Sequence, residues 1–285
     1  MEHVVATSMG WRTIGVCAVW AAIGACLPPS ASRAQDGSEL NTDRDAFTPS
    51  VFCVADGRFL AESSYVFIDN REGLPTNSYP ELLCRHGVSD RLELRFGVNY
   101  DVNAQGNVVT SVEAGEVEEP GRSEHESSLL YGLKAAVSDQ DGLIPQSCFI
   151  MEGDTPVQAK RYGSSPIATI VAGWELPFAF PTRESRPWRL DTSLRYSYVE
   201  GKEEWFSRWG PSAVLRMPVT QRFETHLEWF GTFSDGLHRE TSRPFFSPGC
   251  HVVITRRFEI GLRVGWGLTQ DAAPFFSDVG CGWRY

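Results

Sequence analysis

The chain has 285 residues, 42% of them hydrophobic and 22% charged, and this composition excludes an intrinsically disordered protein. Its formal net charge of −10 argues against a nucleic-acid partner. Seventeen Phe, nine Trp, eight Tyr and 26 Gly stand beside only four Met, a mixture typical of strands and turns. After the N-terminus no apolar run is long enough for a transmembrane helix, whereas barrel strands need only about ten alternating residues.

The N-terminus has the pattern of a secretory signal peptide. Arg12 precedes a mostly apolar run over 14–27, and Ser32-Arg33-Ala34 provides small residues for cleavage after Ala34. We therefore predict a signal peptide at 1–34 and export of the rest of the chain. One alternative stays open, in which Ile23-Gly24-Ala25-Cys26 is a lipoprotein processing site and Cys26 carries a lipid.

The cysteines indicate neither a metal site nor a complete set of disulfides. Of the seven, Cys17 and Cys26 belong to the predicted signal, and the rest have no short CxxC or CxxH spacing. The odd number that follows the signal leaves at least one thiol unpaired. We expect Cys84, Cys250 and Cys281 to act as small apolar side chains of strands, and we predict no metal and no cofactor.

A polar segment at 35–56 is expected to form a periplasmic lead-in, and after it apolar and polar residues alternate with a period of two. Leu94 and Phe96, for example, fall on one face of a strand, and Glu93 and Arg95 fall on the other. Such patterns predict eleven strands, at 57–69, 79–88, 91–101, 126–138, 165–177, 189–199, 208–218, 223–233, 246–255, 257–267 and 274–285.

The connections alternate between tight turns, such as Ser89-Asp90, and longer polar loops, such as 102–124, which is the organisation of membrane barrels. With both termini on the periplasmic side, the strand count must be even. We therefore predict a twelfth strand within 140–164, at Cys148–Met151 or Val157–Tyr162, or else a local departure from the meander. The predicted fold is all-β, an antiparallel transmembrane β-barrel of about 12 strands with meander topology over 57–285.

Alternation alone also fits a soluble sandwich or lipocalin-like barrel, whose apolar faces point inward. Two features favour the outer membrane. Aromatic residues such as Trp229 and Trp266 lie near strand ends, as in interfacial girdles. The last strand ends in Tyr285, an ending that resembles the signal read by the barrel-assembly machinery. We therefore expect outer-membrane lipid and that machinery as partners, the latter through the C-terminal strand.

In a membrane barrel the polar strand faces line the lumen. The lumen-lining candidates are Arg91, Glu93, Arg95, Asp191, Arg195, Glu224, His226, Glu228, Arg257, Glu259 and Arg263. Their mixed signs favour cross-strand ion pairs over a selectivity ring or a substrate site. A lumen of this size can hold a small solute or be closed by a loop.

No catalytic residue is predicted. The chain has no G-x-S-x-G elbow, H-E-x-x-H motif or Walker loop, so we do not expect an enzyme. His226 lies between Glu224 and Glu228 on one strand face, an arrangement that could form an acid–base cluster. We interpret it instead as a lumen histidine paired with a carboxylate.

A family resemblance rests on the block at 80–101, PELLCRHGVSDRLELRFGVNYD, and on the terminal strand at 276–285. Both resemble segments of the MetA-pathway-of-phenol-degradation family of outer-membrane transporters. Shorter segments that fit its turn-then-strand repeat are 132–134, 219–223 and 255–258. The resemblance covers 43–285 and departs in 140–187, where we expect a cysteine-containing insertion in place of simple strands.

The resemblance implies an outer-membrane transporter or channel for small compounds, hydrophobic or aromatic ones included. Two alternatives stay open. One is a closed structural or partner-binding barrel without transport, and the other is a lipid-anchored soluble β-protein that uses Cys26.

Overall fold

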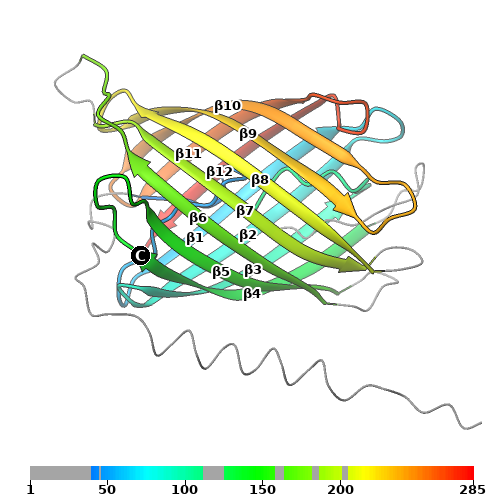
Figure 1. Cartoon of the computed structure of the whole chain (residues 1–285), viewed down its shortest axis with the longest axis horizontal. Coiled ribbons are helices and arrows are strands. Elements are labelled where there is room, and N and C mark those ends of the chain that lie inside the picture. The colour runs from blue at the N-terminus through cyan, green and yellow to red at the C-terminus, as the bar shows by residue number, and fades with distance from the viewer. Residues whose placement is uncertain (1–39, 45, 112–124, 158–163, 182–185, 201–204) are drawn as a thin grey trace, which may run out of the picture. The chain divides into compact units, whose positions relative to one another are not determined.

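The computed structural model describes residues 40–44, 46–111, 125–157, 164–181, 186–200 and 205–285. The predicted signal peptide and Cys26 lie outside these residues. The described residues form a closed antiparallel barrel in which each strand pairs with its neighbours in sequence and β1 pairs with β12 (Figure 1). Its strands are β1 Phe59–Asp69, β2 Thr76–Ser89, β3 Leu92–Val102, β4 His125–Ser138, β5 Gln146–Pro156, β6 Ser165–Glu175, β7 Arg189–Glu200, β8 Trp205–Pro218, β9 Phe223–Asp235, β10 Ser242–Thr255, β11 Phe258–Gly267 and β12 Phe275–Arg284.

The eleven predicted strands are confirmed, and the twelfth is β5, which contains the candidate Cys148–Met151. Of the second candidate, Val157 follows the end of β5, and 158–162 lie outside the described residues. The expected insertion in 140–187 is wrong. This stretch contains β5 and β6, which pair as ordinary antiparallel neighbours with Cys148 opposite Val171.

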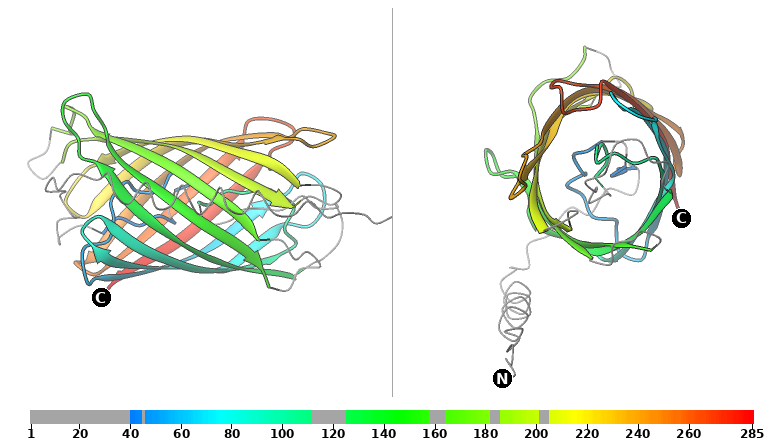
Figure 2. Two further views of the ribbon diagram at one scale, coloured as in Figure 1. Left: turned by 60° about the horizontal axis from the view of Figure 1, so that its bottom comes forward. Right: turned by 90° about the vertical axis from the view of Figure 1, so that its right-hand side faces the viewer.

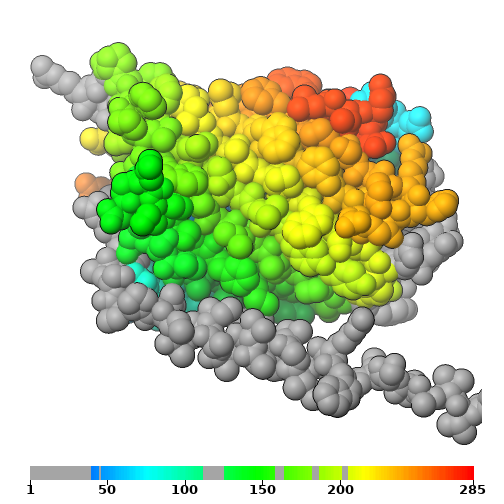
Figure 3. Space-filling view, viewed as in Figure 1, coloured from blue at the N-terminus to red at the C-terminus, as the bar shows by residue number. Residues whose placement is uncertain are grey.

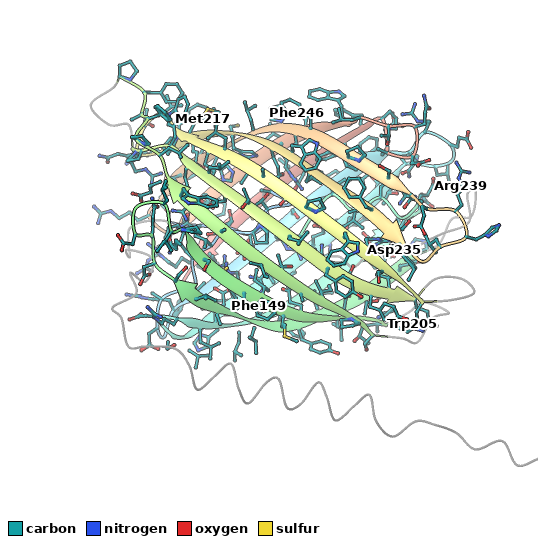
Figure 4. All side chains as sticks on the ribbon, in the orientation of Figure 1. Phe149, Trp205, Met217, Asp235, Arg239 and Phe246 are labelled. Atoms are coloured by element: carbon teal, nitrogen blue, oxygen red, sulfur yellow. The ribbon has the colours of Figure 1, made fainter. Side chains whose placement is uncertain are left out.

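The two ends of the barrel are named after the tightest turns and the longest loop, although the β6–β7 connection at the short-turn end is also long. The short-turn end carries the β2–β3, β8–β9 and β10–β11 turns, the start of β1 and the end of β12. The long-loop end carries the β3–β4 loop and the β9–β10 loop. In Figure 4, Met217 lies near the short-turn end, and Asp235 and Arg239 lie at the long-loop end.

The two faces of the wall are inverted relative to a soluble barrel. On β3, Leu94 and Phe96 are 51% and 50% exposed on the outside, whereas Glu93 and Arg95 are buried inside. The outward side chains of adjacent strands form a continuous surface (Figure 3). A soluble barrel would bury the apolar face, so this arrangement argues against the soluble alternative. No helix among the described residues has the length and hydropathy needed to cross a bilayer.

Two segments occupy the inside of the barrel (Figure 2). The lumenal segment, residues 40–44 and 46–56, enters from the short-turn end and returns there to begin β1. The inward loop, residues 103–111, is the described first part of the β3–β4 loop and enters from the long-loop end. The segments meet where the Ser111 hydroxyl donates to the Asp43 carbonyl oxygen at 2.9 Å.

The predicted periplasmic lead-in at 35–56 therefore needs correction over its described part, which lies in the lumen. Its polar residues suggested exposure to solvent, but inward side chains of the strands satisfy them instead. The backbone N–H of Val54, for example, donates to Glu93 at 2.8 Å.

Candidate functional site

Asp43 is the centre of the ionic contacts between the lumenal segment and the wall. Its buried carboxylate accepts from Arg95 Nη1 at 2.5 Å and from Lys134 Nζ at 3.2 Å, and it lies 3.4 Å from Arg85 Nη1. These three cations come from β3, β4 and β2. The backbone N–H of Ser50 also donates to it, at 2.9 Å, which folds the segment back on itself.

The electrostatic surroundings keep Asp43 ionised. Burial by itself raises the pKa of a carboxyl, but the nearby Arg85, Lys134 and Arg95 lower the pKa of Asp43 well below its ordinary value. A buried carboxylate with three cationic partners is stable only while those partners stay in place. Asp43 therefore attaches the lumenal segment to three strands at once.

The cations around Asp43 have further carboxylate partners on the wall. Arg85 pairs with Glu93 at 2.8 Å and with Glu62 at 3.0 Å, and Arg95 pairs with Glu152 at 2.6 Å. These contacts orient the guanidinium groups from the side of the wall. The wall therefore supplies part of the binding position for Asp43, and the segment completes it, since Arg85 also donates to the carbonyl oxygens of Asn41 and Phe52.

Arg44 makes a parallel contact toward β2 and β3. Its guanidinium pairs with Glu81 at 2.7 Å and donates to Asn99 Oδ1 at 3.0 Å. Neighbouring residues of the segment thus present opposite charges to opposite partners, which fixes its register in the lumen.

A second attachment lies on the other side of the lumen. Glu228 of β9 accepts the backbone N–H groups of Phe47 and Thr48 at 3.1 and 2.7 Å. Arg263 of β11 pairs with Glu228 at 3.2 Å and also donates to the carbonyl oxygen of Val109 in the inward loop. One ion pair of the wall therefore holds both segments.

An aromatic cluster continues from this point toward the long-loop end. The ring of Phe47 stacks on Phe230 with centroids 4.7 Å apart, and Phe230 stacks on Phe245 at 5.1 Å. Phe276 packs edge-on against Phe230 at 5.9 Å. Three of these four rings belong to the inner wall, and the lumenal segment supplies the fourth.

The returning half of the lumenal segment is also held by the wall. Phe52 lies under the Arg189 guanidinium, 4.6 Å from ring centroid to Cζ. The Cys53 thiol contacts the carbonyl oxygens of Arg91 and Lys134, and burial raises its pKa to about 11. Cys53 is therefore a packed and unreactive thiol in this position.

A pocket of about 160 Å³ lies at the short-turn end beside the lumenal segment. Its charged lining is mixed, since Arg216 and Glu224 both line it and lie 3.7 Å apart. Leu40, Asn41 and Thr42 form another part of its lining. The pocket is therefore a vestibule with the lumenal segment as one wall.

Eight of the predicted lumen-lining residues are buried inside the barrel. Those buried on the inner face are Glu93, Arg95, Asp191, Arg195, His226, Glu228, Glu259 and Arg263. Glu224 lies in the vestibule. Arg91 and Arg257 need correction, because they lie in the β2–β3 and β10–β11 turns at the rim, where Arg91 pairs with Asp139 at 3.2 Å.

The interpretation of His226 as paired with a carboxylate was wrong. Neither ring nitrogen has a hydrogen-bond partner among the described residues, and its ring packs against that of His251 with centroids 5.0 Å apart. The flanking carboxylates have other partners: Glu224 faces Arg216, and Glu228 accepts from the lumenal segment and Arg263. The predicted lack of a catalytic site and of a metal site stays a prediction.

Sequence reasoning missed several residues of the site. The most buried of them are Asp43, Glu62, Glu81, Arg85 and Lys134. Arg85 and Lys134 could have been found, because each is a charged residue at an inward position of a predicted strand. No pattern indicated that the segment around Asp43 enters the barrel.

The sequence matches no known family profile and no curated protein. Among solved structures, the chain is similar to an outer membrane channel from Pseudomonas putida F1, with a TM-score of 0.53 and 11% identity, over 90% of this chain and 100% of that one. It is also similar to the NanC porin, with a TM-score of 0.50 and 7% identity, over 79% of this chain and 98% of that one. At such low identity the likeness shows the fold, which is that of an outer-membrane β-barrel.

Proposed function

We propose that this chain is an outer-membrane channel for small solutes, hydrophobic or aromatic ones included, and that its lumenal segment closes it. The observation that carries the proposal is the position of Phe47, whose ring completes an aromatic cluster of the inner wall. When the segment withdraws, Phe230, Phe245 and Phe276 become an aromatic lining of the lumen. A planar apolar solute can then take the place of Phe47.

The size of the barrel supports this proposal. Eight-stranded barrels are filled by their own side chains, whereas wider barrels leave space for a solute or for an inserted segment. Here the centre of the lumen holds two segments that are not part of the wall. The contacts that hold them are ion pairs, hydrogen bonds and ring stacking, all of which are reversible.

The likeness to an outer membrane channel and a porin in fold supports the same proposal, as does the resemblance to the MetA-pathway family. In this proposal the chain belongs to that family, is exported by the signal peptide and is inserted by the barrel-assembly machinery. The short-turn end then faces the periplasm, as is general for outer-membrane barrels.

The test compares the refolded mature chain with a variant that lacks residues 40–54, in planar bilayers and in liposomes that contain benzoate or glucose. Heat-modifiable gel mobility reports folding of both. We expect rare openings of the intact chain, and frequent openings with faster benzoate than glucose flux for the variant. A folded variant that conducts neither ions nor solutes would contradict transport.

That silent outcome would favour the second candidate, a closed structural or partner-binding barrel. The observation on its side is the number of buried contacts at Asp43, which bind the segment to three strands.

A further inference from the structure

A second pocket, outside the lumen contacts described above, lies at the short-turn rim. Its volume is about 230 Å³, and it is lined by Arg58, Arg256, Arg257 and Arg284 together with Val54, Ala55 and Tyr285. The four arginines come from three places in the sequence. Arg58 precedes β1, Arg256 and Arg257 form the β10–β11 turn, and Arg284 ends β12.

The seam that closes the barrel brings these arginines together. The Arg284 backbone N–H donates to the Arg257 carbonyl oxygen at 2.9 Å, and Arg284 Nη2 donates to the Arg256 carbonyl oxygen at 2.9 Å. The Tyr285 N–H donates to the Phe59 carbonyl oxygen at 2.9 Å, one residue after Arg58. The cluster is therefore built on paired backbone and not on loose side chains.

The charges in this pocket are not balanced as they are in the lumen. No carboxylate side chain is among the residues that line it. Within the part of the chain that the structure describes, Arg58, Arg256 and Arg257 form no ion pair, whereas Arg85 and Arg95 each have carboxylate partners. The guanidinium groups of Arg58, Arg256 and Arg257 repel one another unless an anion joins them, whereas Glu259 of β11 already acts on Arg284.

We propose that this pocket binds a phosphate group. Planar guanidinium groups match the geometry of phosphate oxygens with paired hydrogen bonds, and several can share one phosphate. The group can come from free phosphate in solution or from a phospholipid headgroup. Trp283 and Tyr285 beside the pocket are 56% and 76% exposed, which places aromatic interfacial side chains next to the cluster.

The experiment is calorimetric titration of the full mature chain in a nonionic detergent. The probes are inorganic phosphate, dihexanoyl-phosphatidylglycerol and, as a zwitterionic comparison, dihexanoyl-phosphatidylcholine. The test variant is Arg256→Gln with Arg257→Gln, two exposed turn positions. The matched control is Arg71→Gln with Arg239→Gln, which removes two arginines from loops at the long-loop end.

We expect saturable binding that weakens on the order of tenfold in the test variant and is unchanged in the control. Tighter binding of phosphatidylglycerol than of phosphate identifies a lipid site. Binding of inorganic phosphate alone supports the anion site and overturns its lipid source. Equal affinity of the wild type and the Arg256/Arg257 variant, or no saturable binding of any probe, overturns the proposal.

Discussion

The ring of Phe47 in the lumenal segment stacks on the ring of Phe230 in β9, with planes only 11° apart. This contact joins a residue outside the barrel wall to the largest apolar cluster inside it. Val51 of the same segment packs in a separate apolar cluster with Cys148, Ile150 and Val171. Phe47 is therefore the segment's contact with the largest apolar cluster, not its only apolar contact. Removal of the Phe47 ring therefore tests how strongly the segment docks, without changing a residue of the wall.

We predict that Phe47→Ala loosens the lumenal segment and leaves the barrel folded. Loss of a buried phenyl ring costs about 3–5 kcal/mol, and here the cost falls on docking of the segment. Hydrogen exchange measured by mass spectrometry should accelerate over residues 46–54 and stay slow in β9. Phe246→Ala, on the outer face of β10, is the control. Slow exchange over 46–54 in the Phe47 variant would contradict the prediction.

We predict that Asp43→Asn releases the segment more strongly than any exposed substitution. The change leaves Arg85, Arg95 and Lys134 buried without one of their anions, which costs about 3–5 kcal/mol. Single-channel recording should show a higher open fraction. Asp56→Asn, an exposed carboxylate at the exit of the same segment, should behave as wild type. Equal open fractions in the two variants would refute this role of Asp43.

The occlusion should resist acid down to a low pH. The pKa of Asp43 is lowered below its ordinary value of 3.8, so its contribution is complete above that pH and is lost only as pH falls further. Open fraction should therefore be flat from pH 8 to 5 and rise below about 4. Asn at position 43 should abolish this step. A midpoint near pH 6 would contradict the prediction.

Cys53 should report withdrawal of the segment. With a pKa of about 11, roughly one thiol in a thousand is ionised at pH 8, and the group is buried. In a variant whose other four mature cysteines are Ala, maleimide labelling should be at least about a hundredfold slower than in the same protein unfolded in urea. Adding Phe47→Ala should speed it. Labelling at the unfolded rate would place Cys53 outside the lumen.

Gly87→Ala should displace the exit of the lumenal segment. A Cβ on Gly87 would overlap with the backbone carbonyl oxygens of Val54 and Ala55, which cannot turn aside as a side chain can. We expect a loss of about 1–3 kcal/mol in urea unfolding. Gly280→Ala is the matched control, because its nearest neighbour would be at 3.4 Å and the loss should stay within about 0.5 kcal/mol. Equal losses would contradict the close approach at Gly87.

The wall was predictable from sequence because its rule is local. Residues such as Glu93 and Leu94 alternate strictly, and that alternation predicts a strand and sorts its residues onto two faces without knowledge of distant partners. Strand parity then located β5. What local rules cannot decide is which face is inside, since the same alternation suits a soluble barrel.

The filling of the lumen was not predictable, because it depends on pairs far apart in sequence. Charged residues such as Asp43 and Arg44 are as compatible with solvent as with a polar lumen, so their presence does not tell the two environments apart. Arg85 and Lys134 were missed because the inner face there is mixed, with Leu83 and Leu130 also buried inward. Where the wall contacts both apolar and charged parts of an inserted segment, its inward residues are no longer uniformly polar. The alternation from which the inner face is predicted is then lost.

The lumenal segment enters and leaves by the same end of the barrel: Thr42 contacts Glu259 near the start of β11, and Asp56 bridges to Gly87 near the end of β2. Its path is a loop, so β1 can pair with β12 before the segment docks. The segment does not have to pass through the closed barrel from one end to the other. The topology therefore allows closure of the cylinder and filling of its interior to be separate events. A newly closed barrel would then pass through an intermediate without its lumenal segment. The lifetime of that intermediate would depend on how fast the segment docks inside.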